Sequence, residues 1–286
     1  MRFAVVGGDR RSALLAGLLL REGYRVRSFA LEKAELPAEI PKDSTLQACT
    51  YGADAVLLPV PAERGPLIWA PLAAQPLPLE RLFASLWPGQ LVLGGGFSEE
   101  SAAQALRGKL GLADLLRRPS YAAGNAALTA EAAAGLLLRE CERSLRGGRV
   151  LLLGFGRIGK LLARTLDALG ARVTVAARKE ADRALAAALG FGALSFEALE
   201  GAVGEADAVV NTVPARVLSD AALCCVPPEA LLLELASAPG GFDRSLAQNI
   251  GLHVVAAPGL PGRYKALAAA ELIKAELEAI LSEEEA

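Results

Sequence analysis

Apolar residues in the first half of the chain form short runs that alternate with amphipathic stretches. Arg2–Val6 has the pattern of a buried strand, and the turn Gly7-Gly8-Asp9 follows it directly. The next residues place leucines on one helical face and end at Gly23, which predicts a strand–turn–helix unit. Pro59–Pro78 is rich in proline and is expected to be an irregular surface loop. Further buried strands are expected at Tyr24–Phe29, Asp54–Pro59 and Gln90–Leu93.

The second half begins after a long segment without proline. Asn125–Arg146 is rich in Ala, Leu and Glu, which favours a connecting helix, and Gly147-Gly148 is a typical stop signal. Strands and helices then alternate regularly, as in a doubly wound parallel sheet. A final amphipathic helix is expected at Lys265–Leu281, followed by a solvated acidic end at Glu283–Glu285. Strands are expected at Arg149–Leu153, Arg172–Ala176, Gly192–Ser195, Asp207–Asn211, Ala230–Leu235 and Leu252–Ala256.

The composition excludes several classes of protein. The chain has 286 residues, of which 53% are hydrophobic, and this suffices for the cores of about two domains. A net charge of −2 and an aromatic content of 5% provide neither a broad basic surface nor a stacking platform, so no nucleic acid partner is expected. Apolar runs such as Ala13–Leu20 are shorter than the roughly 20 residues of a membrane-spanning helix. We expect a cytoplasmic protein without an export signal or membrane association.

The four cysteines lack the spacing of a metal or redox motif. Cys224 and Cys225 are adjacent, which suits neither a mutual disulfide nor the chelation of one ion. We therefore expect buried free thiols in a reducing compartment, and no metal site.

A glycine fingerprint follows the strand at Arg149–Leu153. The residues Gly154-Phe155-Gly156-Arg157-Ile158-Gly159 fit the pattern G-x-G-x-x-G and open a helix, which is the setting of a dinucleotide-binding turn. Gly154 permits the tight turn, Gly156 lets the backbone approach a diphosphate, and Gly159 lets the helix pack closely on the strand. The N–H groups at the helix start would face the negative charge. A purely structural glycine turn is the alternative.

The end of the next strand indicates which coenzyme would bind. Dinucleotide folds specific for NAD place an Asp or Glu there for the ribose hydroxyls, but here the chain reads Ala176-Ala177-Arg178-Lys179. Arg178 and Lys179 could bind a 2′-phosphate, which predicts NADP rather than NAD. The alternative is that these two cations are a solvated helix start.

Two further loops follow strands of the same sheet and should face the cofactor. The first contains Asn211, Thr212 and Pro214, and the second contains Ser237. Asn211 and Ser237 could donate hydrogen bonds to ribose or nicotinamide, although ordinary turn chemistry would also explain them. The one histidine of the chain, His253, lies within a predicted strand, so the histidine base of hydroxy-acid dehydrogenases is not expected here.

These patterns predict an α/β protein of two Rossmann-like doubly wound domains with an interdomain cleft, similar in layout to formate and glycerate dehydrogenases. We expect a substrate-side domain at 1–124, a connecting helix at 125–145 and an NADP-binding domain at 146–258. A C-terminal loop and helix at 259–286 is expected to return toward the first domain.

The sequence also resembles the dipicolinate synthase A-subunit family of sporulation proteins. Beside the glycine fingerprint, the most specific shared motifs are the start Val6-Gly7-Gly8-Asp9-Arg10 and the loop Ala257-Pro258-Gly259-Leu260-Pro261-Gly262. Other shared segments are Pro59-Val60-Pro61, Asn125 with Thr129-Ala130-Glu131, Leu166 to Lys179, Asn211-Thr212-Val213-Pro214-Ala215, and Leu235-Ala236-Ser237 with Pro239-Gly240-Gly241.

The resemblance implies an NADP-dependent enzyme that converts 4-hydroxy-tetrahydrodipicolinate to dipicolinate with loss of water. It also implies a partner chain, a flavoprotein-like B subunit; we further expect an oligomer. A small dicarboxylate substrate needs cations or N–H donors, and the candidates are Arg10, Arg11, Asn125, Thr129 and Arg263. Glu131 and Lys265 are the candidate catalytic groups, although a position in the first turn of a helix would explain Glu131 without catalysis.

The segment after Gly262 departs from the family pattern. Where the family usually has Ala-Pro-x-Thr-Ala-Gly, this chain reads Arg263-Tyr264-Lys265-Ala266-Leu267-Ala268-Ala269-Ala270. Two alternatives therefore stay open. One is a related NADP-dependent reductase of another small keto or amino acid, and the other is a cofactor-binding subunit without catalysis.

Overall fold

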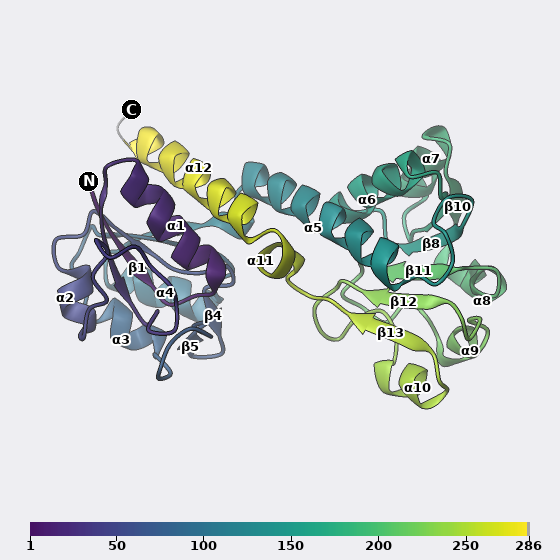
Figure 1. Ribbon diagram of the computed structural model, residues 1–286, viewed down its shortest axis with the longest axis horizontal. Coiled ribbons are helices and arrows are strands. Elements are labelled where there is room, and N and C mark those ends of the chain that lie inside the picture. Colours follow the sequence, from purple (N-terminus) through teal and green to yellow (C-terminus); the bar gives the residue numbers. More distant parts are fainter. Residues whose placement is uncertain (285–286) are drawn as a thin grey trace. The chain divides into compact units, whose positions relative to one another are not determined.

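The computed structural model describes residues 1–284, and the chain divides into two compact units (Figure 1). Unit 1 comprises Met1–Asn125 and Lys265–Ala286, and unit 2 comprises Ala126–Tyr264. Of the predicted acidic end, Glu285 lies outside the described residues, whereas Glu283 forms an ion pair with Arg118 at 2.7 Å.

Unit 1 is built on a parallel sheet with the strand order β2-β1-β3-β6-β7. Its strands are β1 Arg2–Val6, β2 Arg25–Phe29, β3 Ala55–Leu57, β6 Leu91–Gly94 and β7 Gly111–Asp114. The central strands are continuous apolar runs because helices cover both of their faces. The strand β7 was not predicted, since Gly111–Asp114 is only partly buried and has no apolar run.

Two layers of helices enclose the sheet of unit 1. On one face, α1 (Arg10–Arg21) packs beside α12 (Ala266–Glu284), and their buried residues include Leu19, Ile273 and Leu277 (Figure 1). The other face is covered by three shorter helices. These helices are α2 Leu46–Thr50, α3 Leu79–Phe83 and α4 Glu99–Arg107, and a 3₁₀ turn lies at Leu115–Arg117.

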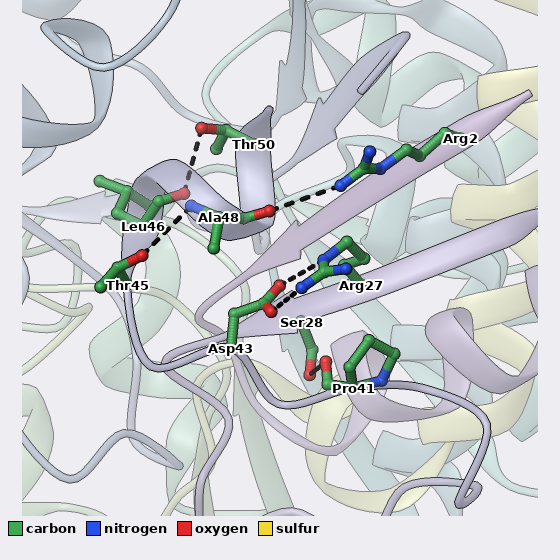
Figure 2. A network of polar contacts seen from close by, with 9 residues as sticks. All are labelled: Arg2, Arg27, Ser28, Pro41, Asp43, Thr45, Leu46, Ala48 and Thr50. Carbon is green, nitrogen blue, oxygen red and sulfur yellow. Dashed lines mark hydrogen bonds and ion pairs between the residues drawn. The ribbon is translucent and has the colours of Figure 1, made fainter. Parts of the chain in front are cut away.

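The segment after β2 is tied to the edge of the sheet by a polar network. Figure 2 shows the carboxylate of Asp43 facing the guanidinium of Arg27, with two hydrogen bonds between them. Thr45 caps α2 by accepting a hydrogen bond from the Ala48 N–H, and Arg2 donates to the Ala48 carbonyl. The Asp43 hydrogen bonds raise the pKa of Arg27. This network fixes a long connection without regular structure of its own.

The prediction of an irregular loop at Pro59–Pro78 was wrong in part. The segment contains a small antiparallel hairpin, β4 (Glu63–Arg64) and β5 (Leu67–Ile68), which turns at Gly65 with φ of 59°. The proline content hid this hairpin, because Pro61 and Pro66 lie outside its paired positions.

Unit 2 has a six-stranded parallel sheet with the order β10-β9-β8-β11-β12-β13. The order reverses beside β8, the first strand of the unit, which is the switch point at which doubly wound sheets bind ligands. All six predicted strands are present, within one or two residues at their ends. They are β8 Arg149–Leu153, β9 Arg172–Ala176, β10 Gly192–Leu194, β11 Ala208–Asn211, β12 Leu231–Glu234 and β13 His253–Ala256.

Helices cover both faces of this sheet as well. One face packs against the C-terminal part of α5 (Pro119–Glu140), α6 (Arg157–Ala168) and α7 (Glu180–Ala188). The core on the opposite face includes residues of α8, α9 and α10. The remaining helices are α8 Leu199–Val203, α9 Asp220–Cys224, α10 Arg244–Asn249 and α11 Leu260–Tyr264, and a 3₁₀ turn lies at Phe196–Ala198.

The predicted connecting helix at 125–145 begins and ends earlier in the structure. It is α5, which starts at Pro119 because proline is well suited to the first position of a helix. Gly124 lies inside α5, where a Cβ would come within 2.7 Å of Leu272 Cδ1. Glu131 consequently lies in the middle of α5, so the first-turn explanation for this residue was wrong.

The expectation of buried thiols holds for one cysteine. Cys49 is buried, and this burial raises the pKa of its thiol to about 12. Cys141 is partly buried, and Cys224 and Cys225 are exposed at the end of the short helix α9. All four are free thiols. Among residues 1–284, no helix is long and apolar enough to cross a membrane.

Candidate functional site

The glycine turn of unit 2 lies between the buried strand β8 and the helix α6. Gly154 has φ of 97°, a conformation that favours glycine, and its N–H donates to the Ala176 carbonyl at the end of β9 at 2.8 Å. A Cβ on Gly154 would lie 2.6 Å from Thr212 Oγ1. The turn therefore passes closely over the carboxyl ends of β9 and β11.

The start of α6 is open. Gly156 is the N-cap residue and has no side chain to cap the helix, and the first turn carries no acidic residue. A Cβ on Gly156 would meet no atom within 4 Å, whereas one on Gly159 would lie 2.2 Å from the Gly154 carbonyl oxygen. The three glycines thus perform the predicted mechanical roles. The N–H groups of the first turn face an open space, which is a suitable environment for an anion.

The other residues of the fingerprint divide between core and surface. The Phe155 ring is buried and packs edge-on against Phe191, so Phe155 can offer a ligand only its backbone. Ile158 packs against the core of unit 2, and Arg157 is exposed as the first residue of α6.

The loop after β9 carries the predicted cationic pair. Arg178 and Lys179 are both exposed between β9 and α7, and Lys179 is the N-cap residue of α7. A residue that was not predicted holds this loop, since Arg183 Nη1 donates to the Ala177 carbonyl at 2.9 Å and to the Arg178 carbonyl at 2.8 Å. The cations and the glycine turn lie at the same edge of the sheet, because Gly154 is bonded to the last residue of β9.

Asn211 and Thr212 support the site from within the protein. Asn211 is fully buried, and its Nδ2 donates to Glu234 at 2.6 Å and to the Val213 carbonyl at 2.9 Å. Both amide protons are therefore used inside unit 2, and neither is left for a ribose or nicotinamide. Thr212 Oγ1 donates to the Leu153 carbonyl at 2.9 Å, directly before the glycine turn. Pro214 is exposed in the same loop.

The loop after β12 depends on a residue that sequence reasoning missed. Glu234 is buried, with 2% of its surface exposed, and accepts hydrogen bonds from the backbone of this loop. A charged residue at the end of the run Leu231-Leu232-Leu233 was the signal that could have revealed it. The predicted Ser237 is exposed in this loop.

The predicted substrate residues of unit 1 differ in their availability. Arg11 is buried, bonded through Nε to Asp9 at 3.1 Å, and donates to the Val60 carbonyl. Its guanidinium also lies 5.6 Å from the centre of the Trp69 ring. Arg10 is exposed as the first residue of α1. Asn125 and Lys265 are also in unit 1 and are partly buried.

The remaining candidates belong to unit 2. Thr129 is buried and Glu131 is exposed, both on α5. Arg263 is exposed on α11 and stacks on Tyr264, with its guanidinium 5.5 Å from the ring centre. The guanidinium of Arg139 lies 5.7 Å from the same ring. The departing segment at 263–270 thus forms the end of α11 and the start of α12.

The strand register separates His253 from the glycine turn. His253 pairs with Leu231 at the start of its strand, whereas Asn211 and Glu234 pair with each other at the opposite edge. Within residues 1–284, no cluster of three or more His, Cys, Asp or Glu residues could hold a metal ion.

Comparison with known proteins divides the chain in the same way. The family model for the N-terminal domain of the dipicolinate synthase A-subunit matches residues 2–116. The model described as "D-isomer specific 2-hydroxyacid dehydrogenase, NAD binding domain" matches residues 126–237. Unit 2 therefore contains a dehydrogenase-type NAD-binding domain, which indicates a nicotinamide cofactor.

Similar proteins span almost the whole chain. The dipicolinate synthase A-subunit of Bacillus subtilis is 29% identical over 289 residues, covering 99% of this chain and 96% of that protein. The crystal structure of the Bacillus subtilis protein superposes with a TM-score of 0.84 at 27% identity, covering 99% of this chain and 96% of the other. The crystal structure of the corresponding protein from Bacillus halodurans also gives 0.84, at 24% identity, covering 98% and 97% of the two chains.

The predicted α/β fold with doubly wound parallel sheets is thus confirmed by the sheets of this chain and by these structures. The resemblance to the dipicolinate synthase A-subunit family that the sequence indicates is confirmed along nearly the whole chain.

Proposed function

We propose that this chain is an NADP-dependent oxidoreductase of the dipicolinate synthase type. The observation that carries the proposal is the uncapped start of α6 at the switch point of the sheet, beside the exposed Arg178 and Lys179. The N–H groups of the first turn of α6 would bind the diphosphate, and the two cations would bind the 2′-phosphate. When bound, the coenzyme supplies a nicotinamide ring that accepts a hydride.

The proposed reaction converts 4-hydroxy-tetrahydrodipicolinate to dipicolinate. Loss of water gives a dihydropyridine dicarboxylate, and loss of a hydride and a proton then gives the aromatic ring. The gain of aromaticity favours the oxidation, so little specialised acid–base machinery is required, which agrees with the position of His253 at the far edge of the sheet. Glu131 and Lys265 remain the candidate acid–base groups of this proposal.

The substrate carboxylates require cationic partners. Arg10 and Arg263 are exposed and can offer guanidinium groups, whereas the guanidinium of Arg11 is already bonded to Asp9 and Val60. Two similar solved proteins are each one kind of chain of a dipicolinate synthase, which supports the proposal that a second, flavoprotein-like chain works with this one.

The proposal is tested by an assay of the purified chain with and without the B subunit. With 4-hydroxy-tetrahydrodipicolinate and NADP⁺ supplied, we expect dipicolinate and reduced coenzyme to form in equal amounts. If no dipicolinate forms with both chains present, the assignment of the reaction is wrong.

Coenzyme preference is tested separately by Arg178→Asp. A carboxylate at this position would repel the 2′-phosphate and could accept hydrogen bonds from the ribose hydroxyls of NAD. We therefore expect the affinity for NADP⁺ to fall by about 30-fold and the preference to invert. The matched control is Arg172→Asp, because Arg172 is exposed at the amino end of the same strand and should have no effect. An unchanged preference in the Arg178 variant would contradict the NADP assignment.

A second candidate function is a reductase of another small keto or amino acid. The observation that favours it is the segment at 263–270, where Arg263 and Tyr264 form a stacked pair in place of the family's Ala-Pro start. A substrate panel, measured with NADPH and with both chains, separates the two candidates. Turnover of a different acid without any dipicolinate formation would favour this alternative.

A further inference from the structure

A buried carboxylate joins the two loops that follow β11 and β12. Glu234 Oε1 accepts hydrogen bonds from Asn211 Nδ2 at 2.6 Å and from the Ala236 N–H at 2.9 Å. Its Oε2 accepts one from the Gly241 N–H at 2.7 Å. In the described part of the chain, these partners are all neutral amides, and no cation forms an ion pair with Glu234. A carboxylate buried in this way keeps its charge only while such donors surround it.

The same network reaches the glycine turn. Asn211 Oδ1 accepts a hydrogen bond from the Val213 N–H at 3.0 Å, and this bond fixes the loop after β11. A Cβ on Gly154 would lie 2.7 Å from Val213 Cγ2, so this loop packs directly on the glycine turn. A Cβ on Gly241 would lie 2.3 Å from Asn211 Cγ, which shows how closely the second loop packs on the amide. Glu234 therefore controls both loops beside the turn.

Resting on the proposed coenzyme binding, we propose that Glu234 is a positioning residue for the nicotinamide half of the coenzyme. A dinucleotide crosses the switch point, so its adenosine half lies toward β9 and its nicotinamide half lies toward β11 and β12. Glu234 holds the loops on the second side. Its negative charge at this edge also favours the oxidised nicotinamide ring, which is positively charged, over the neutral reduced ring.

The test compares the complete coenzyme with a fragment that lacks nicotinamide. For Glu234→Gln, we measure by calorimetry the Kd values of NADP⁺, NADPH and 2′-phospho-ADP-ribose. The glutamine has one acceptor oxygen, and its NH₂ group would oppose one of the N–H donors, so the loops lose a hydrogen bond. We expect binding of NADP⁺ to weaken by about tenfold, with a smaller loss for NADPH. Binding of the fragment should stay within about twofold of the wild type.

Two further variants make the result specific. Glu200→Gln is the matched control, because Glu200 is an exposed carboxylate on α8 of the same unit and should change none of the three Kd values. Glu234→Asp keeps the charge with a shorter reach, so it should weaken NADP⁺ and NADPH equally. If Glu234→Gln fails to fold, Glu234→Asp still tests whether the complete coenzyme is affected more than the fragment.

The outcomes separate this inference from the proposed function. Equal losses for the fragment and the complete coenzyme would overturn the positioning role, because they would indicate a general effect on the fold. An unchanged ratio of the NADP⁺ and NADPH Kd values in Glu234→Gln would overturn the role of the charge. If the wild-type chain binds neither the fragment nor the coenzyme, it is the proposed function that fails.

Discussion

Each unit begins with a strand, a three-residue turn and a helix, and the two turns share their backbone geometry. Gly7 and Gly154 have φ of 69° and 97°. The Gly7 N–H donates to the Phe29 carbonyl at 2.9 Å, and the Gly154 N–H donates to the Ala176 carbonyl at 2.8 Å. The turns differ in the residue that precedes the helix. In unit 1 it is Asp9, whose carboxylate caps α1, and in unit 2 it is Gly156, which leaves α6 uncapped.

This single difference decides which turn can bind an anion. Asp9 already supplies a negative charge at the start of α1 by accepting from the Arg11 N–H at 2.9 Å. The hairpin also closes over the turn of unit 1, since a Cβ on Gly7 would lie 2.9 Å from Ile68 Cγ2. The space above Gly156 is open. Similar backbones therefore support a self-sufficient structural turn in one unit and a ligand site in the other.

The neighbouring strands repeat the contrast. In unit 1, the cation Arg27 of β2 is paired with Asp43, as Figure 2 shows. In unit 2, Arg178 and Lys179 follow β9 and are exposed. The cations of unit 1 thus stabilise the fold, whereas those of unit 2 are available to a phosphate.

The largest expected effect follows from giving unit 2 the cap of unit 1. Gly156→Asp places a carboxylate at the start of α6, where it competes with the coenzyme diphosphate. We expect coenzyme affinity to fall at least about 100-fold, while the melting temperature stays unchanged or rises because the helix gains a cap. Calorimetry and thermal unfolding measure the two effects. Gly156→Ser is the control, because it caps the helix without charge and should lose less affinity.

The reverse change removes the cap of unit 1. Asp9→Ala deletes both the cap of α1 and the ion-pair partner of the buried Arg11. We expect the free energy of unfolding to fall by about 3 kcal/mol, measured by urea denaturation. Asp9→Asn keeps an oxygen for the cap and should lose less. Equal losses for the two variants would mean that the ion pair contributes nothing.

A smaller effect is expected at the Arg27–Asp43 pair. Asp43→Ala leaves a guanidinium of which 33% is exposed, so water can replace part of the lost interaction. We expect a loss of about 1 kcal/mol in the free energy of unfolding. Coenzyme affinity should be unchanged, because the pair lies in unit 1. A change in coenzyme affinity would contradict the division of roles between the two units.

The smallest effect is expected at Tyr121, which is buried beneath α1. Its hydroxyl has no hydrogen-bond partner among the described residues, so Tyr121→Phe should change stability by less than about 1 kcal/mol at pH 7.

The same phenol predicts a dependence on pH. Burial raises the pKa of Tyr121 to about 12, above its ordinary value of 10.0. The folded state therefore retains the proton longer than the unfolded state, and its contribution to stability is lost as the pH rises from about 10 to about 12. Tyr121→Phe should flatten this part of the stability profile, whereas the exposed control Tyr51→Phe should not. Identical profiles for all three proteins would contradict the assignment.

The sequence allowed most of unit 2 to be predicted, because its strands are continuous apolar runs and its turn has the full glycine pattern. The weak strand β7 and the hairpin at Glu63–Ile68 were missed, because short pairings in a proline-rich or half-exposed segment leave little periodic signal. The start of α5 was missed because Gly124 suggested a break, whereas its packing on Leu272 stabilises a continuous helix.

The candidate site was predictable in its backbone but less so in its side chains. The glycine turn and the exposed cations follow from local sequence. The buried pair of Asn211 and Glu234 does not, because it depends on the register of β11 against β12, which brings two distant residues together. Sequence position alone suggested that Asn211 contacts the ligand, whereas its amide protons are used inside unit 2.

Calorimetric titration of the purified wild-type chain with NADP⁺ and NAD⁺ tests the central claim most directly. The open start of α6 beside Arg178 and Lys179 predicts saturable binding of NADP⁺ that is tighter than that of NAD⁺. If neither coenzyme binds the folded chain, with or without its partner subunit, the glycine turn of unit 2 is structural like that of unit 1.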